Sequence, residues 1–266
     1  MKPSLLILGG TTEARQLAAQ LSQAGFDCLL SLAGRTKTPA AQPVPVRTGG
    51  FGGAEGLAEF LKQGRFDLLV DATHPYAAKI SANAARASAL SGVPLVALRR
   101  PGWQRQAGDD WRDAASVAAA VSVLGDAPRR VFVALGRNEL LPFEAAPQHR
   151  YLIRSVDPVE PPLALPDADY ITARGPFPED EERALLEAHG VEVVVSKNSG
   201  GEAAYGKIAA ARALGLPVVM IARPVLPEVE SGESVEAVAD MVLRRFSAFL
   251  PGSPFSPPGR RGPKGG

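Results

Sequence analysis

Residues 5–14 read Leu-Leu-Ile-Leu-Gly-Gly-Thr-Thr-Glu-Ala, and an Ala/Leu-rich stretch follows them. The four apolar residues predict a buried strand, the adjacent glycines predict a tight turn, and residues 12–24 are typical of a helix. A strand that passes through a glycine turn into a helix is the opening unit of a doubly wound α/β sheet. This stretch therefore decides the fold class.

The same alternation of short apolar runs and Ala/Leu-rich runs continues along the chain. In the first half the expected strands are residues 5–8, 28–32, 44–47, 68–71 and 95–98, and the expected helices are residues 12–24, 54–63 and 77–91. In the second half the expected strands are residues 131–135, 151–153, 170–173, 191–195 and 218–222. Such alternation is typical of parallel sheets covered by helices. We therefore expect an α/β protein of two Rossmann-like domains, each with a mainly parallel five-stranded sheet flanked by helices.

The expected boundaries follow from this pattern. We expect a first domain over residues 1–100, a linker over 101–115, a second domain over 116–250, and a disordered Pro/Gly/Ser-rich tail over 251–266. A short internal repeat, in which residues 89–101 resemble residues 213–224, indicates duplication. If the halves are related, their last strands are equivalent and are able to exchange partners between the sheets.

Composition excludes several classes of partner. The net charge of +1 provides no basic excess for nucleic acid or for an anionic membrane surface. The apolar run at the start of the chain is too short for a signal peptide or a membrane span, so we expect a cytoplasmic protein. The single Cys28 lies in an apolar stretch and is expected in the core. The three histidines lack metal-ligand spacing, so no metal site is expected.

The glycine turn is a candidate phosphate site. A turn of this kind presents backbone N–H groups, here with two hydroxyls beside them, to a phosphate at the start of a helix. It is not a full G-x-G-x-x-G motif, so a plain tight turn stays an alternative. The residues expected to contact a dinucleotide here are Gly9, Gly10, Thr11, Thr12 and Glu13.

The end of the second strand indicates which dinucleotide. NAD sites place an Asp or Glu there for the ribose 2′-hydroxyl, but this stretch has Ser31, Arg35 and Lys37 and no carboxylate. A guanidinium matches the oxygens of a 2′-phosphate. Ser31 and Arg35 therefore predict NADPH, with a solvated basic turn as the alternative.

Two further loops leave the same edge of the first sheet. The glycine-rich loop Thr48–Gly53 permits close approach of a ligand, and the loop Asp71–Tyr76 carries several polar side chains. Asp71 is expected to brace its turn. The residues predicted to contact the cofactor are Thr48, Gly49, Gly50 and Thr73, and the catalytic candidates are His74 and Tyr76.

Every expected strand of the second half ends beside a cation. Strand carboxyl ends share one edge of a parallel sheet, where α/β proteins bind ligands. A row of cations there predicts a polyanionic substrate, held between the two halves, although each cation taken alone is also explained as a solvated charge. This cationic rim consists of Arg137, Arg154, Arg174, Lys197 and Arg223.

The loop Ser196–Glu202 within this rim is rich in polar residues and glycine and precedes a helix, which favours binding of a further anion. The predicted substrate-binding residues are Arg137, Arg154, Arg174, Lys197, Asn198, Ser199, Gly200, Gly201 and Lys207. Lys197 and Ser199 are also catalytic candidates.

Six short motifs occur together in one order: Leu8–Ala14, Ala33–Arg35, Thr48–Gly50, Asp71–Tyr76, Thr172–Phe177 and Ser196–Gly201. In combination they resemble the precorrin-6A reductases of cobalamin biosynthesis, over roughly residues 4–225. The resemblance implies reduction of a C=C bond of precorrin-6A, a tetrapyrrole, to give precorrin-6B with NADPH as hydride donor. It also implies transient contact with neighbouring enzymes of the pathway.

The residues alone leave the proton donor open among His74, Tyr76, Lys197, Tyr205, Lys207 and a bound water. Three alternatives for the activity also stay open. They are reduction of cobalt-precorrin-6A with NADH, an NADP-linked reductase of a smaller anion, and a regulator that binds a dinucleotide without catalysis.

Overall fold

The computed structural model describes residues 2–34 and 41–249. Of these, residues 2–34, 41–100 and 225–249 form one compact unit, the first unit, and residues 101–224 form the second unit. Arg35, Lys37 and the expected disordered tail lie outside the described residues.

The first unit is built on a six-stranded sheet in the order β12-β5-β4-β1-β2-β3, and all its strand pairs are parallel. Its elements are β1 (Ser4–Leu8), α1 (Thr12–Gln23), β2 (Asp27–Leu32), β3 (Val46–Thr48), α2 (Ala54–Gln63), β4 (Leu68–Asp71), α3 (Ala78–Ser91), β5 (Leu95–Leu98), β12 (Ser231–Gly232), α7 (Val235–Arg245) and the 3₁₀ turn Ser247–Phe249.

The second unit repeats this arrangement. Its sheet has the order β6-β11-β10-β7-β8-β9, again with parallel pairs throughout. Its elements are β6 (Trp111–Ala114), α4 (Val117–Leu124), β7 (Arg130–Ala134), the 3₁₀ turns Arg137–Glu139 and Leu141–Ala145, β8 (Arg150–Ser155), β9 (Ala168–Thr172), α5 (Glu179–Ala188), β10 (Val193–Lys197), α6 (Gly206–Ala213) and β11 (Val218–Ile221).

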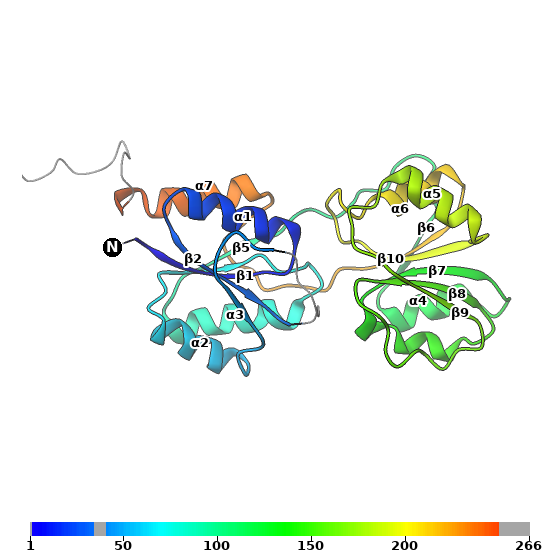
Figure 1. The fold of residues 1–266 in the computed structure, drawn as a ribbon, viewed down its shortest axis with the longest axis horizontal. Coiled ribbons are helices and arrows are strands. Elements are labelled where there is room, and N and C mark those ends of the chain that lie inside the picture. The colour runs from blue at the N-terminus through cyan, green and yellow to red at the C-terminus, as the bar shows by residue number, and fades with distance from the viewer. Residues whose placement is uncertain (1, 35–40, 250–266) are drawn as a thin grey trace, which may run out of the picture. The chain divides into compact units, whose positions relative to one another are not determined.

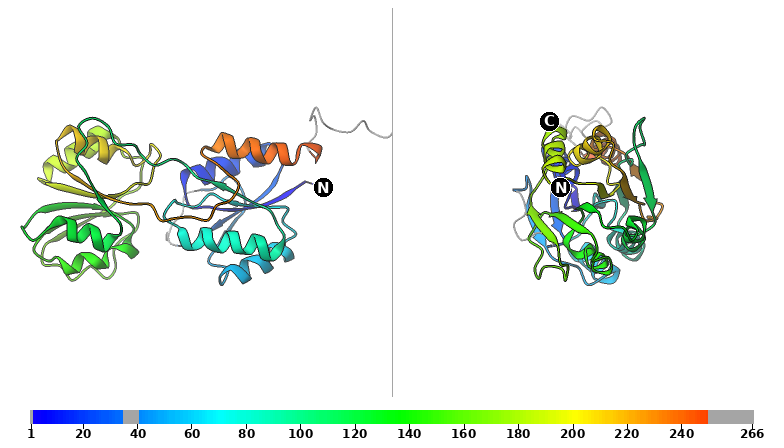
Figure 2. Two further views of the ribbon diagram at one scale, coloured as in Figure 1. Left: turned by 180° about the vertical axis from the view of Figure 1, so that it is seen from behind. Right: turned by 90° about the vertical axis from the view of Figure 1, so that its right-hand side faces the viewer.

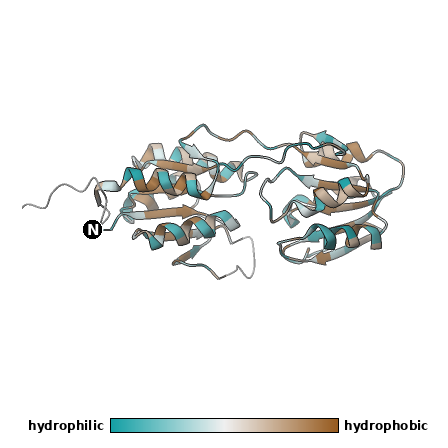
Figure 3. Cartoon of the chain, turned by 90° about the horizontal axis from the view of Figure 1, so that it is seen from above, coloured by the Kyte–Doolittle hydropathy of each residue, from teal (hydrophilic) through white to brown (hydrophobic). Residues whose placement is uncertain are grey.

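Helices cover both faces of each sheet (Figures 1 and 2). In the first unit, Leu5 and Ile7 of β1 join the core beneath α1 and α7, whereas Leu6 and Leu8 join the core beneath α2 and α3. A strand buried on both faces needs apolar side chains at every position. This requirement explains the continuous apolar run at the start of the chain, and Figure 3 shows the contrast between apolar strands and the polar outer sides of the helices.

The ten expected strands are all present, with ends shifted by at most a few residues, and the predicted α/β fold class is confirmed. Each sheet has six strands in the described part of the chain rather than the expected five. The additional strands carry little apolar signal: β6 reads Trp-Arg-Asp-Ala with an exposed centre, and β12 is a Ser-Gly pair.

These two strands are exchanged between the sheets. β6 follows β5 in the chain but pairs with β11, and β12 follows β11 but pairs with β5. The expected linker 101–115 therefore contains a strand of the second sheet, and residues 225–249 belong to the first unit rather than to the expected second domain 116–250. The boundary differs from expectation because strand pairing, not chain order, decides membership of a sheet.

The helix after each exchanged strand begins in the same way. Ser116 caps α4 by accepting a hydrogen bond from the Ala119 N–H, and Ser234 caps α7 by accepting one from the Ala237 N–H, both at 3.1 Å. The fifth strands β5 and β11, which end the repeated segments, also occupy equivalent places in the two sheets. The duplication indicated by the sequence thus extends to the exchanged strand–helix segments.

Cys28 is buried, and burial raises the pKa of its thiol to about 12, which fits a core role. Within the described ranges, no three His, Cys, Asp or Glu side chains gather as metal ligands would. None of the described helices combines the length and the apolarity that crossing a bilayer requires.

Candidate functional site

The glycine turn of the first unit is held firmly in place. A Cβ on Gly9 would lie 2.6 Å from Leu30 Cδ1, and Gly10 has a φ of +111°, so both positions favour glycine. The Thr11 hydroxyl accepts a hydrogen bond from the Ala14 N–H and donates one to the Ala72 carbonyl, both at 3.0 Å. Thr11 therefore caps α1 and ties it to the carboxyl end of β4, while Thr12 stays exposed.

Glu13, in the first turn of α1, forms an ion pair of 2.5 Å with Arg100, which follows β5. Both side chains are largely buried, with 23% and 13% of their surface exposed. A carboxylate at the amino end of a helix is favoured by the helix dipole. Glu13 thus connects two loops of this edge as well as lying beside the predicted phosphate site.

The glycine-rich loop is organised by Arg47, a residue that the sequence reasoning did not select. Its guanidinium donates to the carbonyls of Gly49 (2.7 Å) and Gly50 (2.8 Å) and to Ser31 Oγ (3.3 Å). It also lies 3.7 Å from the centre of the Phe51 ring. The signal that marks it is a cation at a strand end, the same pattern that marked the second half.

Asp71, which ends β4, has no exposed surface. Its carboxylate accepts hydrogen bonds from Thr73 Oγ1 (2.6 Å), Ser81 Oγ (2.6 Å) and Arg99 Nη2 (2.7 Å). The expected brace is thus present. Thr73 was predicted to contact the cofactor, but its side chain is buried and its hydroxyl proton is donated to Asp71.

His74 and Tyr76 follow on the same loop and are half-buried. His74 Nδ1 accepts a hydrogen bond from the Tyr76 N–H at 3.3 Å, and the two ring centres are 5.7 Å apart. This bond makes Nδ1 the acceptor nitrogen, so Nε2 carries the proton of the neutral imidazole. The first unit therefore gathers Gly9–Glu13, Ser31, Thr48–Gly50 and Thr73–Tyr76 at the carboxyl edge of one sheet.

In the second unit the cations of the rim lie at the carboxyl edge of the sheet, but they differ in their surroundings. Lys197 forms an ion pair with Glu139, and Arg223 donates to the carbonyls of Asn198 (2.7 Å) and Pro101 (3.1 Å). Arg174 follows β9 and is exposed, whereas Arg137 begins a 3₁₀ turn after β7 and is half-buried.

Arg154 differs from the other cations of the predicted rim in its burial. Only 6% of its side chain is exposed, and its guanidinium forms a bidentate pair with the buried Glu182 of α5. The Phe177 ring lies 3.7 Å from the guanidinium carbon. A guanidinium that is buried and paired in this way is well placed to hold α5 against β8.

Lys207 is buried next to this pair. Its Nζ donates to the Ala204 carbonyl at 2.5 Å and lies 4.9 Å from the Trp103 ring centre. Burial, with a smaller contribution from the Arg154 charge, lowers the pKa of Lys207 to about 7. Lys207, predicted to bind substrate, thus lies beneath the loop that precedes α6.

The polar loop after β10 is clamped onto the segment Pro101–Trp103. Asn198 Oδ1 accepts from the Trp103 N–H (2.7 Å) and its Nδ2 donates to the Trp103 carbonyl (3.0 Å). Trp103 Nε1 donates to the Gly201 carbonyl at 2.8 Å. Gly200 has a φ of +66°, and a Cβ there would lie 2.1 Å from the Pro101 carbonyl oxygen. Asn198 and Gly200 thus build the loop, and its side chains with acid–base or hydroxyl chemistry are Ser196, Lys197, Ser199 and Glu202.

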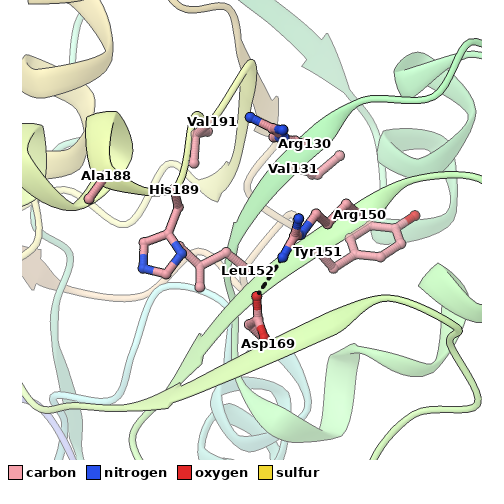
Figure 4. Close-up of a pocket in the computed structure, with 9 residues that line it drawn as sticks. All are labelled: Arg130, Val131, Arg150, Tyr151, Leu152, Asp169, Ala188, His189 and Val191. Atoms are coloured by element: carbon pink, nitrogen blue, oxygen red, sulfur yellow. Dashed lines mark ion pairs between the residues drawn. The ribbon is translucent and has the colours of Figure 1, made fainter.

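Two cavities lie at the opposite, amino-terminal edges of the sheets. One of about 230 Å³ is lined by residues that include Arg130, Arg150, Asp169 and His189, near the starts of β7 and β8 (Figure 4). Another of about 910 Å³ lies in the first unit near the starts of β1 and β2. Neither is lined by a predicted site residue. We place the candidate site at the carboxyl edges because loops there carry the conformationally demanding glycines and the polar side chains.

Comparison with known proteins gives a consistent picture. Residues 4–243 match the family described as "Precorrin-6x reductase CbiJ/CobK". A protein from Sinorhizobium sp named "Precorrin-6A reductase" is 59% identical over 250 residues, which cover 94% of each chain. A solved structure titled "CobK precorrin-6A reductase" is 49% identical, has a TM-score of 0.88, and is matched over 91% of this chain and 96% of that one. A "Cobalt-precorrin-6A reductase" from Priestia megaterium is 31% identical, over 83% of this chain and 90% of its own.

Proposed function

The chain belongs to the precorrin-6x reductase family CbiJ/CobK, and from this premise we propose that it reduces precorrin-6A to precorrin-6B with NADPH in cobalamin biosynthesis. The observation that carries the proposal is the coincidence of two features. The first unit has a glycine turn between β1 and α1 and lacks an acid at the end of β2, and the second unit has cations at its strand ends.

The first unit is the proposed cofactor site. Gly9, Gly10 and the amino end of α1 suit the pyrophosphate, because they present backbone N–H groups next to a fixed turn. Ser31 lies where NAD enzymes carry an acid, and the absence of that acid supports a 2′-phosphate there. Arg35 keeps its proposed role as a phosphate ligand, although it lies outside the described residues.

NADPH would supply a hydride from C4 of its nicotinamide. The chain must align that donor with the acceptor carbon and deliver a proton to the neighbouring carbon. We propose His74, Tyr76, Lys197 and Ser199 as the residues that contact the reacting atoms. They supply an imidazole, a phenol, an ammonium and a hydroxyl as the groups for orienting the substrate and delivering the proton.

The second unit is the proposed substrate site. Precorrin-6A carries acetate and propionate groups, which suit Arg137, Arg174 and Lys197 as ion-pair partners and the Ser199–Gly201 backbone as a donor. We propose that three further residues predicted to bind substrate position the loops around it, because their polar atoms bond other parts of the chain. These residues are Arg154, Asn198 and Lys207. Substitutions of the first group should raise the KM for the tetrapyrrole more than they change cofactor affinity.

The higher identity to the precorrin-6A reductase than to the cobalt-precorrin-6A reductase, 59% against 31%, supports the cobalt-free substrate. The alternative within the family is cobalt-precorrin-6A with NADH. The two are separated by comparing turnover of both substrates with both cofactors.

The proposal is tested with NADPH deuterated at C4. We expect a product that is heavier than precorrin-6A by one deuterium and one hydrogen, because the hydride comes from the cofactor and the proton from a protein group or solvent. A product without deuterium from either face of the cofactor, or no product from protein that binds NADPH, would contradict the proposal.

A further inference from the structure

The adjacent strand ends of β2 and β3 place two polar residues side by side. Ser31 and Arg47 are register partners in this parallel pair. Ser31 occupies the position, roughly 20 residues after the glycine turn, where NAD-binding folds carry the acid that bonds the ribose 2′-hydroxyl. In a cofactor that carries a 2′-phosphate in place of that hydroxyl, the phosphate would therefore lie next to Arg47.

We propose that Arg47, beside Ser31, binds the 2′-phosphate of the cofactor and thereby sets the preference for NADPH over NADH. This inference rests on the proposed function in one respect, namely that the first unit binds a nicotinamide dinucleotide. It adds Arg47 to Ser31 and Arg35 as a residue that determines the specificity for the cofactor.

The guanidinium of Arg47 is held in one orientation, but not all of its N–H donors form hydrogen bonds with described residues. Its Nη1 donates to Ser31 Oγ and the Gly49 carbonyl, and its Nη2 donates to the Gly50 carbonyl. The Nε–H and the second Nη2–H make no hydrogen bond with any described residue. A guanidinium has five N–H donors, so two of them are left for the oxygens of a ligand.

The charge of Arg47 also lacks a carboxylate partner among the described residues, in contrast to Arg99 and Arg100 of the same unit, which pair with Asp71 and Glu13. Packing on Phe51 at 3.7 Å shields one face of the guanidinium from water. A preoriented, half-buried cation of this kind binds a phosphate dianion more strongly than a mobile surface lysine does.

The competing interpretation is that Arg47 only clamps the glycine-rich loop. The two roles predict different results, because a loop clamp affects every dinucleotide equally, whereas a phosphate ligand affects only those that carry the 2′-phosphate. Arg47→Gln keeps amide donors for the loop carbonyls but removes the charge. Arg47→Met keeps the apolar contact with Phe51 but removes both the donors and the charge.

The experiment is calorimetric titration of the full chain and its variants with NADPH, NADH, adenosine 2′,5′-bisphosphate and AMP. We expect Arg47→Gln and Arg47→Met to lower the NADPH-to-NADH affinity ratio at least tenfold, and to do the same for the bisphosphate relative to AMP. Arg86→Met, which removes an exposed arginine of α3, is the matched control and should leave both ratios unchanged.

Equal losses for both members of each pair, or unchanged ratios, would overturn the inference while the proposed function stands. Preference of the unmodified chain for NADH would overturn it as well. If the unmodified chain binds none of the four nucleotides, the proposed function fails first and the inference with it. If Arg47→Met does not fold, Arg47→Gln decides, since it retains the donors that the loop needs.

Discussion

At the residue scale, single backbone positions determine whether the loops of the candidate site form. Gly200 illustrates this, because both its positive φ and its closeness to the Pro101 carbonyl exclude a side chain. The sequence showed the Gly-Gly pair and suggested ligand approach. The structure shows that the glycine also allows the segment at Pro101 to approach closely.

We expect Gly200→Ala to destabilise the second unit by about 1–3 kcal/mol more than Gly215→Ala does. The two glycines have the same φ of +66°, but a Cβ on Gly215 meets nothing within 4 Å. The difference therefore isolates the clash from the backbone strain. Urea unfolding of both variants measures this difference in the free energy of unfolding. Equal destabilisation would show that the segment Pro101–Trp103 moves aside without a loss of stability.

The buried Lys207 makes stability depend on pH. Its pKa is lowered from 10.5 to about 7 in the folded chain, so between these values the unfolded chain binds the proton and the folded chain does not. The free energy of unfolding then rises with pH across that window. We expect the stability of the unmodified chain, measured relative to Lys207→Met, to increase between pH 7 and pH 10. A difference that is independent of pH would mean that the ammonium is solvated.

The predicted site residues divide by how much of their environment the sequence reveals. Strand-end position identified the turn at Gly9, the loop of His74 and the rim of the second unit. It did not reveal that Arg154 has a buried partner, because Glu182 is 28 residues away and lies on a helix otherwise rich in exposed acids. Pairing of this kind depends on the fold and not on the local pattern.

At the element scale, the strands that the sequence predicted with the most accurate ends are those buried on both faces, whereas the predicted edge strands β3 and β9 are largely exposed. β4 and β5 were predicted with their observed ends. All four residues of each strand are buried, and all of them except Asp71 are apolar, so the apolar run marks where each strand lies. β6 and β12 lie at sheet edges, where a short polar strand is stable once a neighbour supplies its hydrogen bonds. Their formation depends on β11 and β5, so no local sequence pattern predicts them.

The capping serines of the exchanged helices give a test at this scale. We expect Ser234→Ala to cost about 1 kcal/mol, because it leaves the Ala237 N–H without its acceptor. Ser234→Asp should keep the cap, because a carboxylate also accepts from the Ala237 N–H, and should be about as stable as the unmodified chain. Ser116→Ala should cost a similar amount in the second unit. Chemical denaturation followed by circular dichroism measures each change, and an Asp variant as weak as the Ala variant would contradict the capping role.

At the scale of the whole molecule, the exchange makes each unit depend on a distant part of the chain. α7 contributes Val238, Ala239 and Val242 to the core of the first unit, and each of these is fully buried. The expected first domain, residues 1–100, therefore contains β5 but leaves out β12 and α7, which belong to the same unit. Duplication hinted at the exchange, but only strand pairing decides between an exchanged and an unexchanged arrangement.

A chain that ends at Pro224 should lose the fold of its first unit, because β12 and α7 are removed and the core beside α1 is uncovered. We expect rapid proteolysis within residues 2–100 and loss of nucleotide binding. A chain that ends at residue 249 serves as the control and should behave like the full chain. Retained nucleotide binding in the shorter chain would show that the exchanged segment is dispensable.

The central claim is that this chain reduces precorrin-6A with NADPH. Its most direct test follows the nicotinamide absorbance during anaerobic incubation of the full chain with precorrin-6A and either cofactor. The account predicts oxidation of one NADPH for each precorrin-6A consumed, and a kcat/KM for NADPH at least tenfold above that for NADH. Binding of NADPH without oxidation in the presence of precorrin-6A would contradict it.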